Sequence, residues 1–310
     1  MNRLPVLPVC VSLVFAATLV CAARVGAQDQ GQDPAAVNMA PSGPSYTTEA
    51  PPPQEQAAPQ PEVGAPDQGP DDSGYAEQPS ETAAQPPPAL PDYEQPPPPA
   101  DGYIWTPGYW AYSPSGYFWV PGAWVEPPYM GALWTPGYWG FYGGRYMFYH
   151  GHWGLHIGFY GGINYGFGYL GRGYEGGYWN SNRFYYNREF NHIDDRRVHN
   201  VYSYHVDVQR GGNFRGGENN QRPSYRGGQG GVQARPQPSE GAAWREPTAP
   251  RMSSQVQHEQ RYQSSRGQFA NTNHGQPARP AVSRPLRADR NVQPTVRAQG
   301  NQGRGGGQRR

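Results

Sequence analysis

Three histidines, His150, His152 and His156, come closest in type and spacing to a metal site. In a strand, His150 and His152 would point to the same face, and neutral imidazoles bind zinc, copper or nickel. A closed zinc site takes four ligands, however, and neither a cysteine nor an acidic residue stands nearby in the sequence. We therefore regard these histidines as weak metal candidates with hydrogen-bonding roles, and we expect no bound metal or cofactor.

Residues for catalysis are sparse. Glu189 lies near His192, but the acidic and basic residues at 194–197 are typical of a solvated charge cluster. The cysteines are Cys10 and Cys21, and the sequence has neither a serine nucleophile motif nor a glycine-rich phosphate loop before a helix. We predict that the protein is not an enzyme.

Tryptophans form the clearest pattern in the chain, because Trp-x-Pro-Gly-x-Trp occurs three times at nearly even spacing. If the strands around them bury an aliphatic face, the indoles form an exposed platform that suits a carbohydrate or wall polymer, since large apolar patches mark binding surfaces. If the indole face is the core, which we favour, the platform vanishes. We expect a unit this small to bury only one of the two faces. The candidate platform comprises Trp105, Trp110, Trp119, Trp124, Trp134 and Trp139.

Four Arg-Gly-Gly triplets resemble the RGG boxes that bind nucleic acid through phosphate neutralisation and loose stacking. The N-terminal sequence, discussed below, predicts export. In an exported chain, arginines meet anionic envelope polymers or lipid phosphates before RNA, and we therefore do not expect a nucleic-acid partner. RNA binding stays the alternative for a chain that is not exported. The triplets begin at Arg210, Arg215, Arg226 and Arg304.

A Pro-Gly pair at the centre of each repeat copy predicts a turn. Proline fixes φ at about −65°, and glycine accepts the positive φ of a type II turn. Each copy would then be a hairpin whose two indoles face each other across the strands. Two-residue hairpins prefer other turn types, so a wider turn or splayed strands remain alternatives. The predicted turn residues are Pro107, Gly108, Pro121, Gly122, Pro136 and Gly137.

Residues 102–205 are the one candidate for a packed unit. They lack the apolar period of an amphipathic helix, and Gly and Pro punctuate them as in short strands and tight turns. A strand is predicted over Arg145–Tyr149, and a last hairpin over 178–190 with its turn at 180–182. The fold class is a small all-β, aromatic and Gly-rich antiparallel hairpin meander with an aromatic core, flanked by long disordered arms.

The two arms differ in charge. Residues 28–101 are rich in proline and acidic residues and contain no Arg or Lys, which predicts a disordered acidic spacer. Residues 206–310 are rich in Arg, Gly and Gln, which predicts a disordered basic tail. The formal net charge of +1 therefore hides a strongly polarised chain.

Residues 1–27 have the pattern of a secretory signal peptide, with Arg3, an apolar stretch at 9–23 and small residues before a cleavage site after Ala27. The apolar stretch is short for a membrane span, and the mature chain contains no predicted transmembrane helix. Lipidation at Cys21 is the alternative, but Val20 stands where a small residue is expected. We predict export to the periplasm, the outer membrane surface or the medium.

Together with Tyr103, the triple repeat resembles the bacterial YXWGXW (WXXGXW) repeat proteins, and the Gly/Tyr-rich segment 158–169 is similar to the continuation seen in part of that group. The resemblance implies a secreted or envelope location and supplies no catalytic residue, and the function of the group is largely unknown. One departure is that Pro precedes Gly in every copy. We therefore expect a non-enzymatic structural or interaction protein of the cell envelope, with carbohydrate binding as the main alternative.

Overall fold

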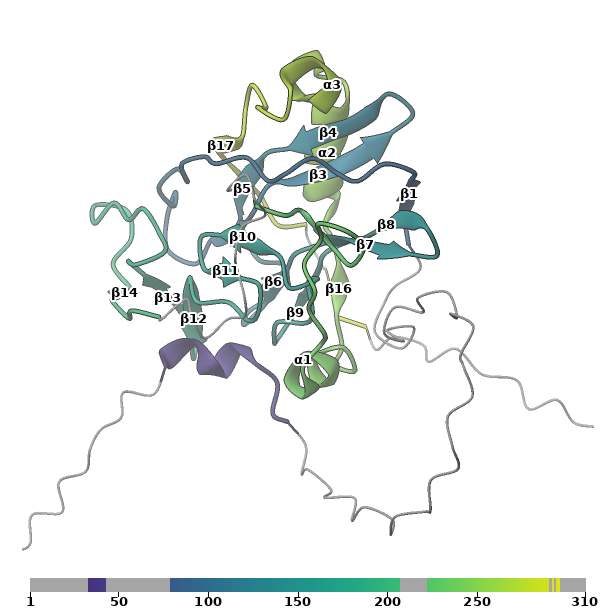
Figure 1. The fold of residues 1–310 in the computed structure, drawn as a ribbon. Helices are drawn as coiled ribbons and strands as arrows, with labels where there is room; N and C mark the ends of the chain where they lie inside the picture. Colours follow the sequence, from purple (N-terminus) through teal and green to yellow (C-terminus); the bar gives the residue numbers. More distant parts are fainter. Residues whose placement is uncertain (1–32, 43–78, 207–221, 290–291, 293, 296–310) are drawn as a thin grey trace, which may run out of the picture. The chain divides into compact units, whose positions relative to one another are not determined.

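The computed structural model describes residues 33–42, 79–206, 222–289, 292 and 294–295, which belong to one compact unit, Asp33–Arg310. The predicted signal peptide, including Cys21, lies outside the described residues. Small sheets dominate this part of the chain (Figure 1). Within it, no helix has the length and apolar character needed to cross a membrane. The prediction of an all-β fold built from antiparallel hairpins is confirmed.

The first two repeat copies form one long hairpin that turns at residues 113–116. Trp110 faces Trp119 near the turn, and Trp105 faces Trp124 farther from it. Both arms of the hairpin are interrupted at their Pro-Gly pairs, which lie opposite each other. The strands are β2 (Ile104–Thr106), β3 (Tyr109–Ser113), β4 (Gly116–Val120) and β5 (Gly122–Val125).

The third copy forms a second hairpin of the same design. Trp134 faces Trp153, and Trp139 faces Phe148. Residues 148–153 are thus a fourth, degenerate copy of the form Phe-x-x-Gly-x-Trp, and its start at Phe148 continues the spacing of the others. The predicted strand over Arg145–Tyr149 is confirmed. The strands are β6 (Leu133–Thr135), β7 (Tyr138–Tyr142), β8 (Arg145–Tyr149) and β9 (His152–Gly154).

The predicted pairing of indoles within one copy is wrong, because the Pro-Gly pairs do not reverse the chain. None of the three predicted turn glycines has a positive φ. Glycine is required there for close approach instead. A Cβ on Gly122 would lie 2.6 Å from Cζ2 of Trp105, and one on Gly137 would lie 2.8 Å from the backbone nitrogen of Gly151. Partner copies therefore pack through their glycines, and indoles pair between copies.

The Gly/Tyr-rich segment continues the small sheets. The predicted hairpin at 178–190 is confirmed, and Ser181 in its turn has a φ of 55°. Ahead of the repeat, a 3-10 helix, η1 (Pro34–Asn38), packs against β12. The strands are β10 (Asn164–Gly166), β11 (Tyr169–Leu170), β12 (Gly177–Asn180), β13 (Arg183–Asn187) and β14 (Val201–Tyr202).

The acidic spacer, predicted to be disordered throughout, is ordered over residues 33–42 and 79–101. Strand β1 (Glu81–Ala83) pairs with β8, and extended chain follows it. Proline has a carbonyl acceptor but no N–H donor. A Pro-rich backbone therefore has more carbonyls than its own N–H groups can satisfy, and these carbonyls can accept hydrogen bonds from other segments. The Ala89 carbonyl accepts the Trp110 indole N–H at 3.1 Å, and the Pro96 carbonyl accepts that of Trp124 at 2.7 Å.

The basic tail is likewise ordered over residues 222–289, which corrects the prediction of disorder there. Three of its strands extend the sheets of the repeats. Strand β15 pairs with β7. Strand β16 pairs with β9, and β17 pairs with β5 (Figure 1). Its elements are β15 (Tyr225–Arg226), α1 (Pro238–Ala243), β16 (Ala249–Pro250), α2 (Ser253–Gln263), η3 (Arg266–Gln268), α3 (Ala270–Asn273) and β17 (Ala281–Leu286).

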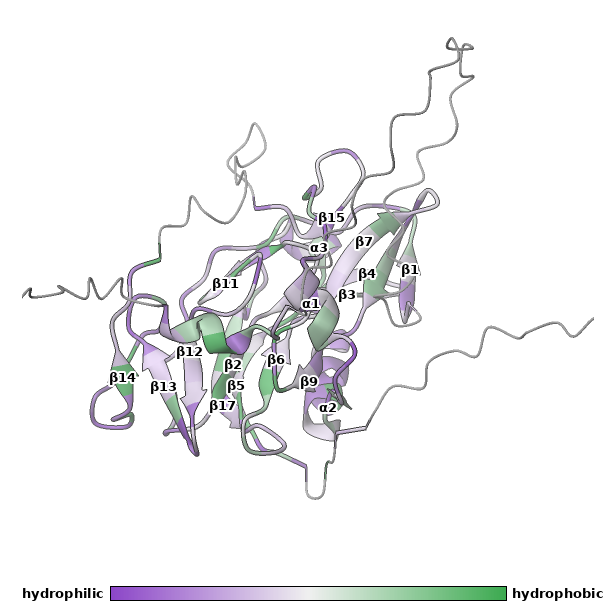
Figure 2. Cartoon of the chain, turned by 90° about the horizontal axis from the view of Figure 1, so that it is seen from below, coloured by the Kyte–Doolittle hydropathy of each residue, from purple (hydrophilic) through white to green (hydrophobic). Residues whose placement is uncertain are grey.

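Both faces of the first hairpin are buried, which contradicts the expectation that only one could be. The indoles lie in the main core, while Ala111, Phe118 and Val120 form a second cluster against Phe269. Helices α2 and α3 contact β4 and cover this aliphatic side (Figure 1). Most of α2 is hydrophilic (Figure 2), so its sequence gives no amphipathic signal. The tail supplies the cover that the repeat lacks.

Candidate functional site

The six indoles of the candidate platform are core residues and form no exposed surface. Trp134 is the most exposed of them at 6%. The partner rings lie 5.1–5.3 Å apart between centroids, as in Trp105 with Trp124 and Trp110 with Trp119. The Trp119 N–H is satisfied by the Pro280 carbonyl at 2.9 Å. The structure agrees with the favoured interpretation, in which the indole face is the core, and contradicts the alternative of an exposed Trp-ladder platform.

The three histidines are placed in separate environments. Burial lowers the pKa of His150 and of His152 to about 4, so both are neutral at pH 7. His156 instead contacts the Glu246 carboxylate, with 2.8 Å between Nδ1 and an oxygen. Among the described residues, no group of three or more His, Cys, Asp or Glu side chains could hold a metal ion.

One of the Arg-Gly-Gly triplets is structural. Arg226 is only 4% exposed, and its Nε donates to the Ala234 carbonyl at 2.7 Å. Its guanidinium lies over the rings of Tyr142 and Phe159, 5.8 and 5.3 Å from their centroids. This arginine is therefore withdrawn from the surface. The triplets at Arg210, Arg215 and Arg304 lie outside the described residues.

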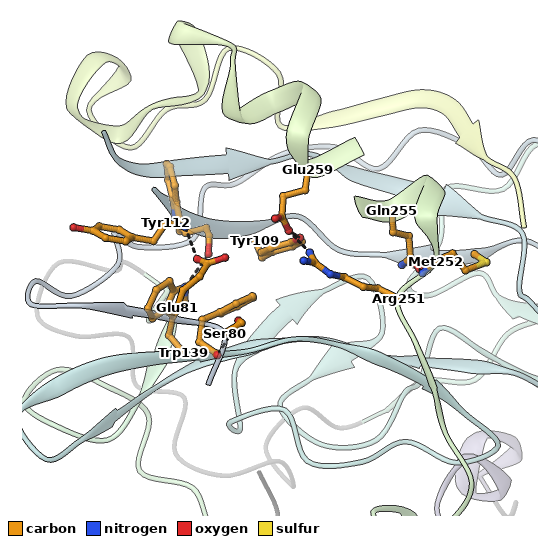
Figure 3. A network of polar contacts seen from close by, with 11 residues as sticks. Ser80, Glu81, Tyr109, Tyr112, Trp139, Arg251, Met252, Gln255 and Glu259 are labelled. Atoms are coloured by element: carbon orange, nitrogen blue, oxygen red, sulfur yellow. Dashed lines mark hydrogen bonds and ion pairs between the residues drawn. The ribbon is translucent and has the colours of Figure 1, made fainter. Parts of the chain in front are cut away.

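A partly buried polar network joins the spacer, the repeat and the tail (Figure 3). The Glu81 carboxylate accepts the Tyr112 N–H at 2.7 Å. The Tyr109 hydroxyl donates to Glu259 at 2.5 Å, and Arg251 pairs with the same carboxylate. The Glu81–Tyr112 and Tyr109–Glu259 contacts join segments far apart in the chain, so the network ties both arms to the first repeat hairpin.

This network contains an acid that titrates near neutral pH but no room for a substrate. Burial raises the pKa of the Glu81 carboxyl to about 7. The neighbouring cavity, lined by Tyr109, His150 and Arg251 among others, has a volume of about 20 Å³. That space accommodates one water molecule. The geometry of this network therefore supports a structural role, in which it holds the spacer and the tail against the repeat.

Replacing Glu81 by Gln should raise Tm in alkaline solution and leave it unchanged near pH 4. The carboxyl has an ordinary pKa of about 4.5 and a folded pKa of about 7. Its stabilising contribution is therefore present below pH 4.5 and is lost as the pH rises through 7. The amide keeps an oxygen for the Tyr112 N–H, so the gain above pH 8 should be about 2 kcal/mol, or roughly 4–8 °C.

Thermal unfolding followed by circular dichroism at both pH values measures this effect. Glu94→Gln, which changes an exposed carboxyl in the same arm, is the control and should show no gain. Equal Tm values for Glu81→Gln and the parent protein at high pH would contradict the assignment.

A basic groove with a volume of about 640 Å³ lies between α2 and β17. Arg261 projects from the helix, and Arg279 and Arg284 come from the strand side; all three are exposed. No acidic side chain is among the described residues that line the groove. Nor does any of these three arginines form an ion pair within the described part of the chain.

Two further polar groups belong to the wall of the groove. The Ser254 hydroxyl is buried and has no hydrogen-bond partner among the described residues. His258 contacts the Pro121 carbonyl through Nε2 at 2.8 Å, and this contact anchors α2 to the repeat. The sequence predicted the tail as an anion contact but did not indicate this site, because α2 has no apolar stripe. The spacing of Ser254, His258 and Arg261 along one helical face was the available signal.

The WXXGXW repeat family model, in two copies, matches residues 101–125. The resemblance inferred from the tryptophan pattern is therefore confirmed for the first hairpin. No curated protein and no solved structure matches the chain.

Proposed function

We propose that this protein is a non-enzymatic, exported interaction protein of the bacterial cell envelope that binds anionic polymers in the groove between α2 and β17. The observation that carries the proposal is the set of Arg261, Arg279 and Arg284 around an open groove without an acidic residue among its described lining. Export rests on the sequence of residues 1–27.

The groove favours anions over other ligands for an electrostatic reason. Three guanidinium groups that line one groove repel one another, and a bound phosphate or carboxylate relieves that repulsion. Guanidinium also matches the geometry of these anions with paired N–H donors. Because the arginines are exposed, the attraction is screened by salt. A polymer that contacts several of them at once gains more than a single ion does.

Substitution of Arg261, Arg279 and Arg284 by Gln together should weaken polyanion binding by about tenfold, since an exposed ion pair contributes roughly 0.5 kcal/mol and tenfold is about 1.4 kcal/mol. Sodium polyphosphate is the soluble probe, titrated into the mature chain by calorimetry at low and high salt. The matched control replaces Arg145, Arg196 and Arg235, which are exposed and lie outside the groove. It removes the same net charge and should retain the parent affinity.

Equal losses in the two triple variants would show that net charge, and not the groove, controls binding. Vesicles with and without phosphatidylglycerol separate the two anion sources, because a lipid-phosphate site should bind vesicles and a polymer site should prefer polyphosphate. Recovery of the chain outside the cytoplasm with Gln28 as its first residue tests export. A chain that keeps Met1 inside the cell would overturn that part of the proposal.

A further inference from the structure

A second groove, of about 400 Å³, lies between the β12–β13 hairpin and the segments that flank the first repeat hairpin, residues 101–103 and 126–130. Trp179 forms part of its wall, and its N–H donates to the Ala132 carbonyl at 3.0 Å. The indole also packs edge-on against Phe184, with 5.4 Å between centroids. Met130, 60% exposed, contributes another apolar wall. Trp179 is thus a partly exposed indole held in a fixed orientation, which the buried repeat indoles cannot offer.

Polar side chains surround these apolar walls. Asp101 and Glu126 provide carboxylates, and Asn182 and Asn200 provide amides. An oriented aromatic ring bordered by a few hydrogen-bonding groups in a cavity of this size is typical of small-ligand sites. A sugar ring fits this chemistry, because its flat apolar face stacks on an indole while its hydroxyls donate to carboxylates and amides.

The aromatic groove adjoins the basic groove. Glu126 lines the first and Arg287 lines the second, and their side chains lie 3.7 Å apart. The backbone links the same two walls, because the Glu126 N–H donates to the Leu286 carbonyl at 2.9 Å and the Ala288 N–H donates to the Glu126 carboxylate. One elongated ligand can therefore reach both grooves.

From this adjacency we infer that the ligand is an acidic polysaccharide, with a sugar ring on Trp179 in the aromatic groove and its anionic groups on the arginines of the basic groove. The inference rests on the proposed function, since it names the class of polymer that the basic groove would hold. It also explains why an interaction protein carries an oriented indole beside a cluster of arginines.

The test compares three probes on the mature chain: tetragalacturonate, its neutral methyl ester and sodium polyphosphate. Trp179→Ala should weaken tetragalacturonate binding about tenfold and leave polyphosphate binding unchanged. Met130→Ala, at a position too exposed to affect folding, should weaken tetragalacturonate alone by a smaller factor. Leu155→Ala removes a side chain of comparable exposure, 50%, outside both grooves and is the control. A thermal melt of each variant establishes that it is folded.

The outcomes separate the two proposals. If folded Trp179→Ala and Met130→Ala bind tetragalacturonate as the parent protein does, the sugar site is wrong while the basic groove stands. If polyphosphate fails to bind, or binds the triple arginine variant equally well, the proposed function fails. Weak binding of the neutral ester that disappears in Trp179→Ala would support the sugar site directly.

Discussion

A Gly137→Ala variant is expected to unfold roughly 6–12 °C below the parent protein, a loss of about 3 kcal/mol. The added Cβ would lie 2.6 Å from the Tyr149 carbonyl oxygen and 2.8 Å from the Gly151 nitrogen. Both obstacles are backbone atoms of the partner copy, so no side-chain rotation can relieve the contact. The two copies must separate, and the pairing of Trp134 with Trp153 weakens with them.

Gly158→Ala is the matched control for this substitution. Like Gly137, Gly158 has no positive φ, but its new Cβ would meet only side-chain atoms of His152 and Thr135, at 3.6 Å or more. Circular dichroism melts of the two variants should therefore differ by several degrees. Indistinguishable Tm values would show that the glycine in the repeat is not required for close approach.

The requirement for glycine illustrates what the sequence could and could not predict. The repeat correctly predicted strands, an aromatic core and indoles that meet across a hairpin. It predicted the wrong partner, because Pro-Gly is locally typical of a turn, whereas the pairing of Trp105 with Trp124 depends on contacts between different copies of the repeat. The even spacing of the copies held the correct information, and it also extends to Phe148.

Order in the two arms was harder to predict, because the composition of a segment indicates only whether that segment can fold by itself. A Pro-rich, acidic segment cannot bury enough apolar surface to fold by itself. Residues 79–101 become ordered because indole N–H groups of the repeat need acceptors, as Trp110 and Trp124 show. In the tail, α2 is held by polar contacts such as that of Gln255 with Trp153, 2.9 Å apart. Neither contact produces a hydrophobic period.

The candidate site could likewise be predicted only in part from the sequence. Arginine content predicted an anion contact in the tail, and the structure shows exposed arginines around a groove between α2 and β17, where we propose that such a contact forms. The sugar-binding alternative pointed to the repeated indoles, which are buried. Trp179, outside the repeat, has the partial exposure that such a role needs. The repeated tryptophans are thus residues of the core, whereas Trp179, which stands outside the repeat, is partly exposed.

Removal of residues 207–310 should prevent the remaining chain from folding cooperatively, the largest effect that we predict. The truncation exposes Phe118 and Val120, which are at most 2% exposed, and burial of each such side chain stabilises by roughly 1.5–3 kcal/mol. It also removes β16 and β17, which leaves unpaired edges on β9 and β5 that favour aggregation. The Trp119 and Trp153 N–H groups lose their acceptors as well.

A chain that ends at Thr295 is the control, because it loses basic residues while keeping β15, β16, β17 and the helices. It should melt within a few degrees of the full chain. The fragment 28–206 should instead aggregate, or give no cooperative melt, and should recover a melt when a peptide covering 222–289 is added. A fragment 28–206 that stays monomeric and melts like the full chain would show that the repeat folds alone. In that case the tail would be a ligand of the hairpin and not part of its core.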